Sequence, residues 1–129
     1  MSLENELTDK VSQIFREQWS DRSGQVVPLP DSVKLTNDAV KLTGVVLYAD
    51  MSESTKLVDT YNPAFAAEIY KAYLHCAAKI IRSEGGEITA YDGDRIMAVF
   101  IGDYKNSSAT RAALKINYAR IKIINPEIK

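Results

Sequence analysis

The chain has 129 residues, of which 46% are hydrophobic and 26% charged, as is typical of one globular domain with a buried core. Its net charge is −1 and its pI is about 5.8, so we expect no general attraction to nucleic acid. The single cysteine excludes an intrachain disulfide and a cysteine-rich metal site. No apolar run approaches the roughly 20 residues of a membrane span and no signal-peptide pattern is present, so we expect a cytoplasmic protein without a membrane partner.

Residues 2–19 are predicted to form a helix, with Ser2 or Thr8 suited to cap it. Its apolar side chains recur at spacings of three and four and therefore share one face: Leu3, Leu7, Val11, Ile14, Phe15 and Trp19. This apolar stripe fits a dimer arm or partner helix, and it fits equally well a helix packed on its own domain.

Residues 20–38 are polar and are interrupted by Gly24, Pro28 and Pro30, a pattern typical of a connecting segment. We therefore expect an N-terminal helix and connecting segment over residues 1–43. A separate domain is expected over residues 44–129.

That domain begins with an apolar strand over residues 44–50 and a short helix over residues 54–61. A long helix then starts at Pro63 and ends at Gly85-Gly86. Within it, His75 and Cys76 cannot form a catalytic pair, because neighbouring helix positions diverge by about 100°. Cys76 is assigned to the core and His75 to the surface.

Two strand-like runs, residues 87–91 and 95–101, flank Asp92-Gly93-Asp94 and predict a β-hairpin. A last helix is expected to be capped by Asn106-Ser107 and closed by Asn125-Pro126. The predicted fold is α/β, with long helices on a central sheet that is mixed, because a helical crossover separates the first strand from the hairpin. Since three strands make a thin sheet, we expect the N-terminal part of a longer catalytic domain.

Asp50 ends the first strand and Asp94 lies in the hairpin turn, so the two carboxylates meet if those strands are neighbours. Two carboxylates and a backbone oxygen hold Mg²⁺ when substrate phosphates complete its coordination. The hydroxyl-rich loop after Asp50 suits phosphate. Asp residues are also common in turns, and that reading is favoured for Asp92.

Two motifs then resemble a known family. Leu-Tyr-Ala-Asp-Met-Ser-Glu-Ser-Thr (47–55) resembles the first signature of class III nucleotidyl cyclases, and Asp-Gly-Asp-Arg-Ile-Met-Ala-Val-Phe (92–100) resembles the second. The resemblance covers residues 44–124 and implies a truncated, ferredoxin-like cyclase core. It also implies conversion of a nucleoside triphosphate into a 3′,5′-cyclic nucleotide and pyrophosphate.

By this resemblance, Asp50 and Asp94 would be catalytic and would bind two Mg²⁺ or Mn²⁺ ions, with the Met51 carbonyl as a further ligand. The β- and γ-phosphates would be held by residues of the following loop: Ser52, Glu53, Ser54 and Thr55.

The chain departs from the family at the residues expected near the base. Ala90 occupies the position of the lysine that reads adenine, so a purine-reading hydrogen bond is missing. Tyr48 and Arg95 flank the aspartates and are suited to contact a base or a phosphate. The alternative is a half-buried strand tyrosine and a solvent-facing arginine.

The combined motifs look most like the bacterial pyrimidine cyclases of the Pycsar antiphage system, which implies UTP or CTP as substrate. Class III cyclases complete their sites in head-to-tail homodimers with residues from a C-terminal part that this chain lacks. We therefore expect low or no activity from the chain alone. The alternatives are an adenylate cyclase, a diguanylate cyclase, a non-catalytic homologue that binds nucleotide or dimerises, and an α/β domain whose Asp residues only shape turns.

Overall fold

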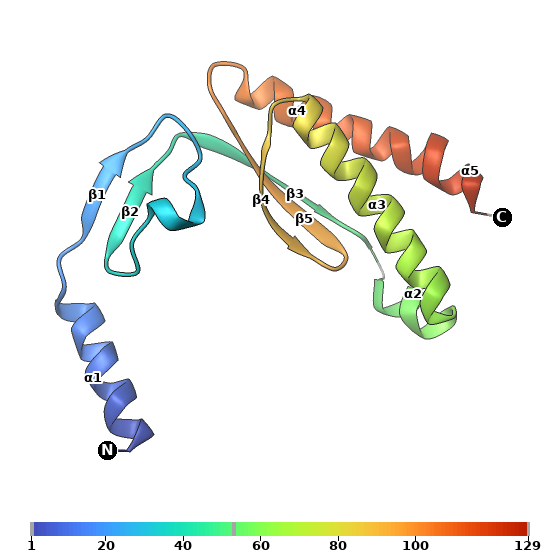
Figure 1. Ribbon diagram of the computed structural model, residues 1–129. Helices are drawn as coiled ribbons and strands as arrows, with labels where there is room; N and C mark the ends of the chain where they lie inside the picture. The colour runs from blue at the N-terminus through green and yellow to red at the C-terminus, as the bar shows by residue number, and fades with distance from the viewer. Residues whose placement is uncertain (1, 53, 129) are drawn as a thin grey trace. The chain divides into compact units, whose positions relative to one another are not determined.

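The computed structural model describes residues 2–52 and 54–128, and the chain divides into two compact units, Met1–Leu42 and Thr43–Lys129. Figure 1 shows the helices and strands of each unit. No helix in the described ranges is long and apolar enough to cross a membrane.

The first unit begins with α1 (Leu3–Arg16), and Ser2 caps it by accepting a hydrogen bond from the Asn5 N–H at 3.2 Å. The helix ends earlier than predicted because Glu17 is extended. The Asn37 side-chain amide donates to the carbonyls of Ile14 and Glu17, at 3.0 and 2.9 Å, which satisfies part of the helix end. The apolar stripe stays exposed, from 45% at Ile14 to 85% at Phe15.

The expected connecting segment instead contains a small two-stranded sheet. Strands β1 (Ser20–Ser23) and β2 (Asp38–Lys41) pair in parallel across the short 3₁₀ turn η1 (Pro30–Ser32). Arg22 explains why polar residues pair here. Its guanidinium donates to the Asp38 carboxylate at 2.7 Å and to the Ser32 carbonyl at 2.9 Å, which ties the strands to the turn between them.

The second unit holds a three-stranded sheet in the order β3-β5-β4. Its strands are β3 (Gly44–Asp50), β4 (Glu87–Asp92) and β5 (Arg95–Ile101). Both described pairings are antiparallel, so the prediction of a mixed sheet was wrong for these strands. The crossover does make β3 and β4 run in the same direction, but β5 lies between them and pairs with both.

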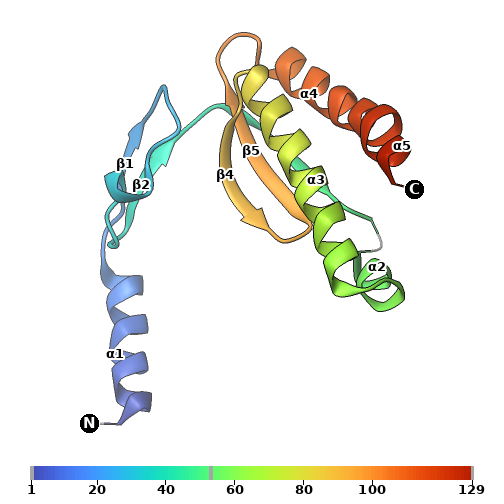
Figure 2. The ribbon, with the colours of Figure 1, turned by 45° about the vertical axis from the view of Figure 1, so that its right-hand side comes forward.

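The helices of this unit are α2 (Ser54–Thr60), α3 (Pro63–Ser83) and α4 (Lys105–Ala119), followed by the π-helical turn η2 (Arg120–Ile124) and α5 (Asn125–Glu127). Helices α3 and α4 pack against the sheet and each other (Figures 1 and 2). Alternate residues of β5 point into this core, and Ile96, Ala98 and Phe100 are at most 1% exposed. On β3, Val46 and Tyr48 remain exposed on the other face.

The ends of α3 follow the sequence signals. Asn62 accepts a hydrogen bond from the Phe65 N–H at 2.8 Å and caps the helix before Pro63. At the other end Gly85 has a φ of +84°, which favours glycine. Gly86 has no room for a side chain, because an added Cβ would lie 2.6 Å from the Phe100 ring.

The predicted Asn106-Ser107 cap of the last helix was wrong. Helix α4 begins at Lys105, and Tyr104 occupies the capping position without a side-chain bond. The chain already turns at Gly102, where φ is +94°, so the helix starts before the predicted cap. Asn106 lies inside the helix and its carbonyl accepts a hydrogen bond from the Thr110 hydroxyl at 2.8 Å.

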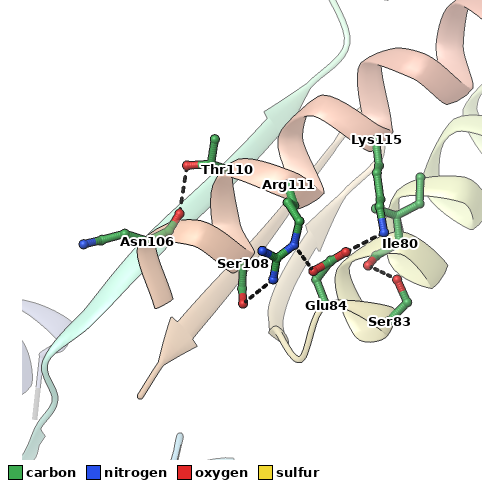
Figure 3. A network of polar contacts seen from close by, with 8 residues as sticks. All are labelled: Ile80, Ser83, Glu84, Asn106, Ser108, Thr110, Arg111 and Lys115. Carbon is green, nitrogen blue, oxygen red and sulfur yellow. Dashed lines mark hydrogen bonds and ion pairs between the residues drawn. The ribbon is translucent and has the colours of Figure 1, made fainter. Parts of the chain in front are cut away.

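Glu84, at the end of α3, joins that helix to α4 (Figure 3). Its carboxylate accepts hydrogen bonds from Lys115 at 2.6 Å and from Arg111 at 3.0 Å. These contacts, first with Lys115 and then with Arg111, lower the pKa of the Glu84 carboxyl below its ordinary value.

Candidate active site

The sheet register brings Asp50 and Asp94 to one edge of the second unit. Asp50 is the last residue of β3 and lies opposite Arg95, the first residue of β5. One residue further, the Met51 N–H donates to the Asp94 carbonyl at 2.9 Å. The strand end and the hairpin turn are therefore held together by backbone pairing, as the predicted convergence of the two aspartates requires.

Asp92 has a different role from the two candidate metal ligands, Asp50 and Asp94. Gly93 has a φ of +49° in the tight turn, and the Asp94 N–H donates to the Asp92 carbonyl. The Asp92 carboxylate accepts hydrogen bonds from Arg95 Nε at 3.0 Å and Nη2 at 2.7 Å. Asp92 therefore supports the turn and orients Arg95, in line with its interpretation as a turn residue.

Arg95 and Tyr48 lie beside each other next to Asp50. The Arg95 guanidinium lies over the Tyr48 ring, 5.7 Å from its centre. The hydrogen bond with Asp92 is the main cause that raises the pKa of Arg95, and the charge of Asp50 adds to it. Tyr48 is 52% exposed, so its ring presents an accessible face that is backed by a fixed cation.

Tyr73 of α3 belongs to the candidate site although neither sequence motif contains it. It is half-buried, and burial raises the pKa of its hydroxyl, with further increases from the charges of Asp50 and Asp94. Because the charges of both carboxylates act on the Tyr73 hydroxyl, all three groups lie in one region. A tyrosine among isoleucines and alanines was the available signal, since a partly buried hydroxyl needs a polar neighbour.

Two cavities share Asp50, Tyr73 and Arg120 in their walls. One, of about 300 Å³, also contacts Tyr48. The other, of about 450 Å³, also contacts the loop residue Ser52. Asp50 therefore borders space at the end of β3 that a ligand could enter.

The predicted phosphate loop is described only in part. Ser52 is exposed beside Asp50, whereas Glu53 lies outside the described residues. Ser54 and Thr55 form the start of α2. The hydroxyl positions that the phosphate prediction requires are therefore not among the described contacts.

Ala90 lies on β4 opposite Met97, next to a shift in the strand register. It is exposed and, as expected for alanine, offers no side-chain hydrogen bond to a base. Arg95 and Tyr48 are the polar side chains that the sheet places near Asp50 instead. His75 and Cys76 lie elsewhere, on a groove between α3 and the C-terminal helical segment, with His75 exposed and Cys76 partly buried.

The donor set at the β3–β5 edge suits a hard divalent cation that is shared with a ligand. The described residues contain no group of three or more His, Cys, Asp or Glu side chains placed to hold a metal by themselves. Asp50 and Asp94 supply two carboxylates, and Mg²⁺ commonly takes one or two carboxylates together with substrate phosphates and water. Burial is the main cause that raises the pKa of Tyr73, and the negative charges of both aspartates add to it.

Comparison with known proteins extends these observations. No family model matches the chain. A curated uridylate cyclase of Xanthomonas perforans is 52% identical over 98% of this chain and 55% of its own length. A second uridylate cyclase, from Burkholderia cepacia, is 48% identical over 99% of this chain and 57% of its own length. The chain is a homologue of these cyclases. It spans about half the length of the curated relatives it matches.

Solved cyclase structures share the fold of more than half of the chain. A bacterial light-regulated adenylyl cyclase matches with a TM-score of 0.54 and 25% identity, over 57% of this chain and 38% of that protein. The guanylyl cyclase Cya2 matches with a TM-score of 0.53 and 22% identity, over 57% of this chain and 40% of its own, which supports the fold alone. The predicted resemblance to class III nucleotidyl cyclases and the predicted fold class are confirmed.

Proposed function

We propose that this cyclase homologue forms the metal- and phosphate-binding half of an enzyme that converts UTP into 3′,5′-cyclic UMP and pyrophosphate. The observation that carries the proposal is the pairing of β3 with β5, which places Asp50 beside the Asp94 turn. UTP is preferred over CTP because the curated relatives are named uridylate cyclases. The missing lysine at Ala90 argues against a purine.

In this reaction the ribose 3′-oxygen forms a bond to the α-phosphorus while the bond from that phosphorus to the pyrophosphate oxygen breaks. Bound Mg²⁺ or Mn²⁺, two ions in the proposed site, supplies positive charge that acidifies the hydroxyl and stabilises the leaving pyrophosphate. The carboxylates of Asp50 and Asp94 and the carbonyl of Met51 would hold the metal. Tyr73, with its raised pKa, stays neutral beside them.

We assign the remaining contacts by residue type. Residues 52–55 provide the loop for the β- and γ-phosphates. The exposed Tyr48 ring is suited to stack on a pyrimidine, and Arg95 is oriented by Asp92 toward the same face.

We further infer that the active form is a head-to-tail homodimer of a longer polypeptide in the cytoplasm. Its proposed role is that of Pycsar cyclases, whose cyclic pyrimidine product signals phage infection. The support is the motif resemblance and the greater length of the curated relatives. The catalytic groups of the proposed second half would come from the segment beyond this chain and from the partner.

The test is a product assay with ATP, GTP, CTP and UTP in Mn²⁺, and cyclic products are identified by mass. It compares this chain with a form extended to the length of its relatives, and with the Asp50→Asn and Asp94→Asn variants of that form. We expect cyclic UMP from the extended form and at least a hundredfold less from either variant.

Each other result would change the assignment. Cyclic AMP as the main product would keep the cyclase reaction but would contradict the argument from Ala90. Metal-dependent UTP binding with no cyclic product from the extended form would favour a non-catalytic nucleotide-binding homologue.

A further inference from the structure

Arg120 is a cation of the site that neither motif contains. It lines both cavities that border Asp50 and Tyr73. The Asn117 side-chain oxygen accepts hydrogen bonds from Arg120 Nε at 3.3 Å and Nη2 at 3.0 Å. Among the described residues, Arg120 forms no ion pair, whereas Arg95 and Arg111 are each paired with a carboxylate.

The backbone places Arg120 at a break in the α-helical pattern. It is the first residue of the π-helical turn Arg120–Ile124, and its carbonyl accepts a hydrogen bond from the Asn125 N–H, five residues on. Single π-helical turns often occur at functional sites, because the extra residue reorients the side chains around it. Here the turn lies where the C-terminal helical segment passes the end of β3.

The geometry of the guanidinium leaves it free to bind a further group. An arginine side chain has five N–H donors in a planar fork, and Asn117 takes one from Nε and one from Nη2. The remaining donors on Nη1 and Nη2 form the edge that makes paired hydrogen bonds with phosphate or carboxylate. A neutral amide as the anchor orients the guanidinium without neutralising its charge.

We propose that Arg120 is a phosphate-binding residue of this site, anchored by Asn117, and that it contacts non-bridging oxygens of the bound nucleoside triphosphate. This inference rests on the proposed function and extends it from the two signature motifs to Asn117 of α4 and Arg120 of η2. It accounts for an arginine that forms no ion pair with a described residue and lines the same cavities as Asp50. A triphosphate brings more negative charge than the motif residues alone can balance, and a cation in the same cavities as Asp50 supplies part of the balance.

The test measures binding of UTP and of uridine to the chain in Mn²⁺ by calorimetry, together with Mn²⁺ binding alone by electron paramagnetic resonance. Arg120→Gln removes the charge and the fork, and Arg120→Lys keeps the charge. The matched control is Lys122→Gln, which removes the same charge from an exposed residue of the same turn that lines neither cavity. Circular dichroism and thermal unfolding verify that each variant is folded.

We expect Arg120→Gln to weaken UTP binding roughly tenfold or more, the effect of losing a hydrogen bond between charged groups. Uridine binding and Mn²⁺ binding alone should not change. Arg120→Lys should recover part of the loss, and Lys122→Gln should bind UTP like the unaltered chain.

Other outcomes separate this inference from the proposed function. If Asp50→Asn abolishes Mn²⁺-dependent UTP binding and Arg120→Gln leaves it unchanged, the proposed function stands and the role of Arg120 is refuted. An equal loss of UTP and uridine affinity would place Arg120 at the base or ribose and would overturn the phosphate assignment. If the unaltered chain and its extended form bind no nucleotide, both proposals fail.

Discussion

At the scale of single residues, the site depends on a few side chains with unequal surroundings. The Asp92 carboxylate accepts hydrogen bonds from Arg95, whereas Asp50 lines both cavities. Burial is the main cause that raises the pKa of Tyr73, and the charges of Asp50 and Asp94 add to it. Asp92 and Asp94, which are separated only by Gly93, therefore have different surroundings. The difference arises because the turn directs Asp92 toward Arg95 at its own strand end.

Gly86 is a position where one added carbon should be costly. A Cβ there would lie 2.6 Å from the Phe100 ring and 2.8 Å from Ile81, both of which are at most 1% exposed. We expect Gly86→Ala to lower the free energy of unfolding by about 1–3 kcal/mol, the usual cost of overpacking a core. Urea denaturation followed by circular dichroism measures this change.

A second substitution tests the cause of that loss. Phe100→Leu removes ring atoms that crowd position 86, so the double variant should be more stable than the sum of the two single effects predicts. Strict additivity, or a neutral Gly86→Ala, would contradict the steric explanation.

At the scale of elements, Glu84 determines how firmly α3 is joined to α4. Its pKa is lowered in the folded protein, so the contacts with Lys115 and Arg111 stabilise the fold at pH values above the ordinary carboxyl pKa of 4.5. That contribution should be lost as the pH falls below this value and the carboxylate is protonated. Glu84→Gln should therefore be less stable than the unaltered chain at pH 7, and the difference should shrink by pH 3.

Thermal unfolding of both proteins across this pH range provides the measurement. Asp103→Asn, which changes an exposed carboxyl outside this network, serves as the control. A difference that stays constant with pH would show that the Glu84 carboxylate is not a stabilising charge.

Elements were predicted best where local signals are strong. Three features follow rules that act within a few residues: the apolar run of β3, the Asp92-Gly93-Asp94 turn, and the start of α3 at Pro63 with its end before Gly85-Gly86. The errors concern pairing. Strands β1 and β2 are too short and polar to be recognised, since Arg22 and Asp38 stabilise them from positions far apart in sequence. The sheet was predicted to be mixed because the crossover suggested a parallel pairing, whereas β5 pairs antiparallel with β3 across two helices.

The residues of the candidate site also divide into those with a local sequence signal and those that only the tertiary fold brings together. Asp50 and Asp94 were proposed as site residues because each follows a strong local pattern, and the proximity of the strand end and the turn needed only the assumption that their strands are neighbours. Tyr73 and Arg120 were missed because each is an ordinary helix residue until α3 and η2 are placed beside β3. Their proximity is a tertiary property, and one sequence does not encode it as a local motif.

At the scale of the whole molecule, the buried core consists only of residues from the second unit, within the described ranges. We therefore expect a chain of residues 43–129 to fold by itself and to unfold at the same temperature as the 129-residue chain. Differential scanning calorimetry measures both midpoints. A midpoint lower by more than about 4 °C would indicate a stabilising contribution of at least roughly 1 kcal/mol from residues 1–42.

The exposed apolar stripe of the first unit can be tested with the same two chains, residues 43–129 and the 129-residue chain. Leu3, Phe15 and Trp19 are each at least 67% exposed, so the alternatives of a dimer arm and a helix packed on its own domain both stay predictions. Sedimentation of the two chains distinguishes them. Loss of a dimer on removal of residues 1–42 would favour the arm.

The division of the site between β3 and the hairpin also determines when it forms during folding. Strands β4 and β5 are adjacent in sequence and close through a tight turn, so Asp94 reaches its position through a local and rapid step. Asp50 arrives only when β3 pairs with β5 across α2 and α3, which carries a larger loop-closure cost. The proposed ligand site is therefore completed by the pairing that carries the larger loop-closure cost. Nucleotide affinity should therefore appear last on the folding pathway, and a nascent or partly folded chain should not sequester UTP or its metal.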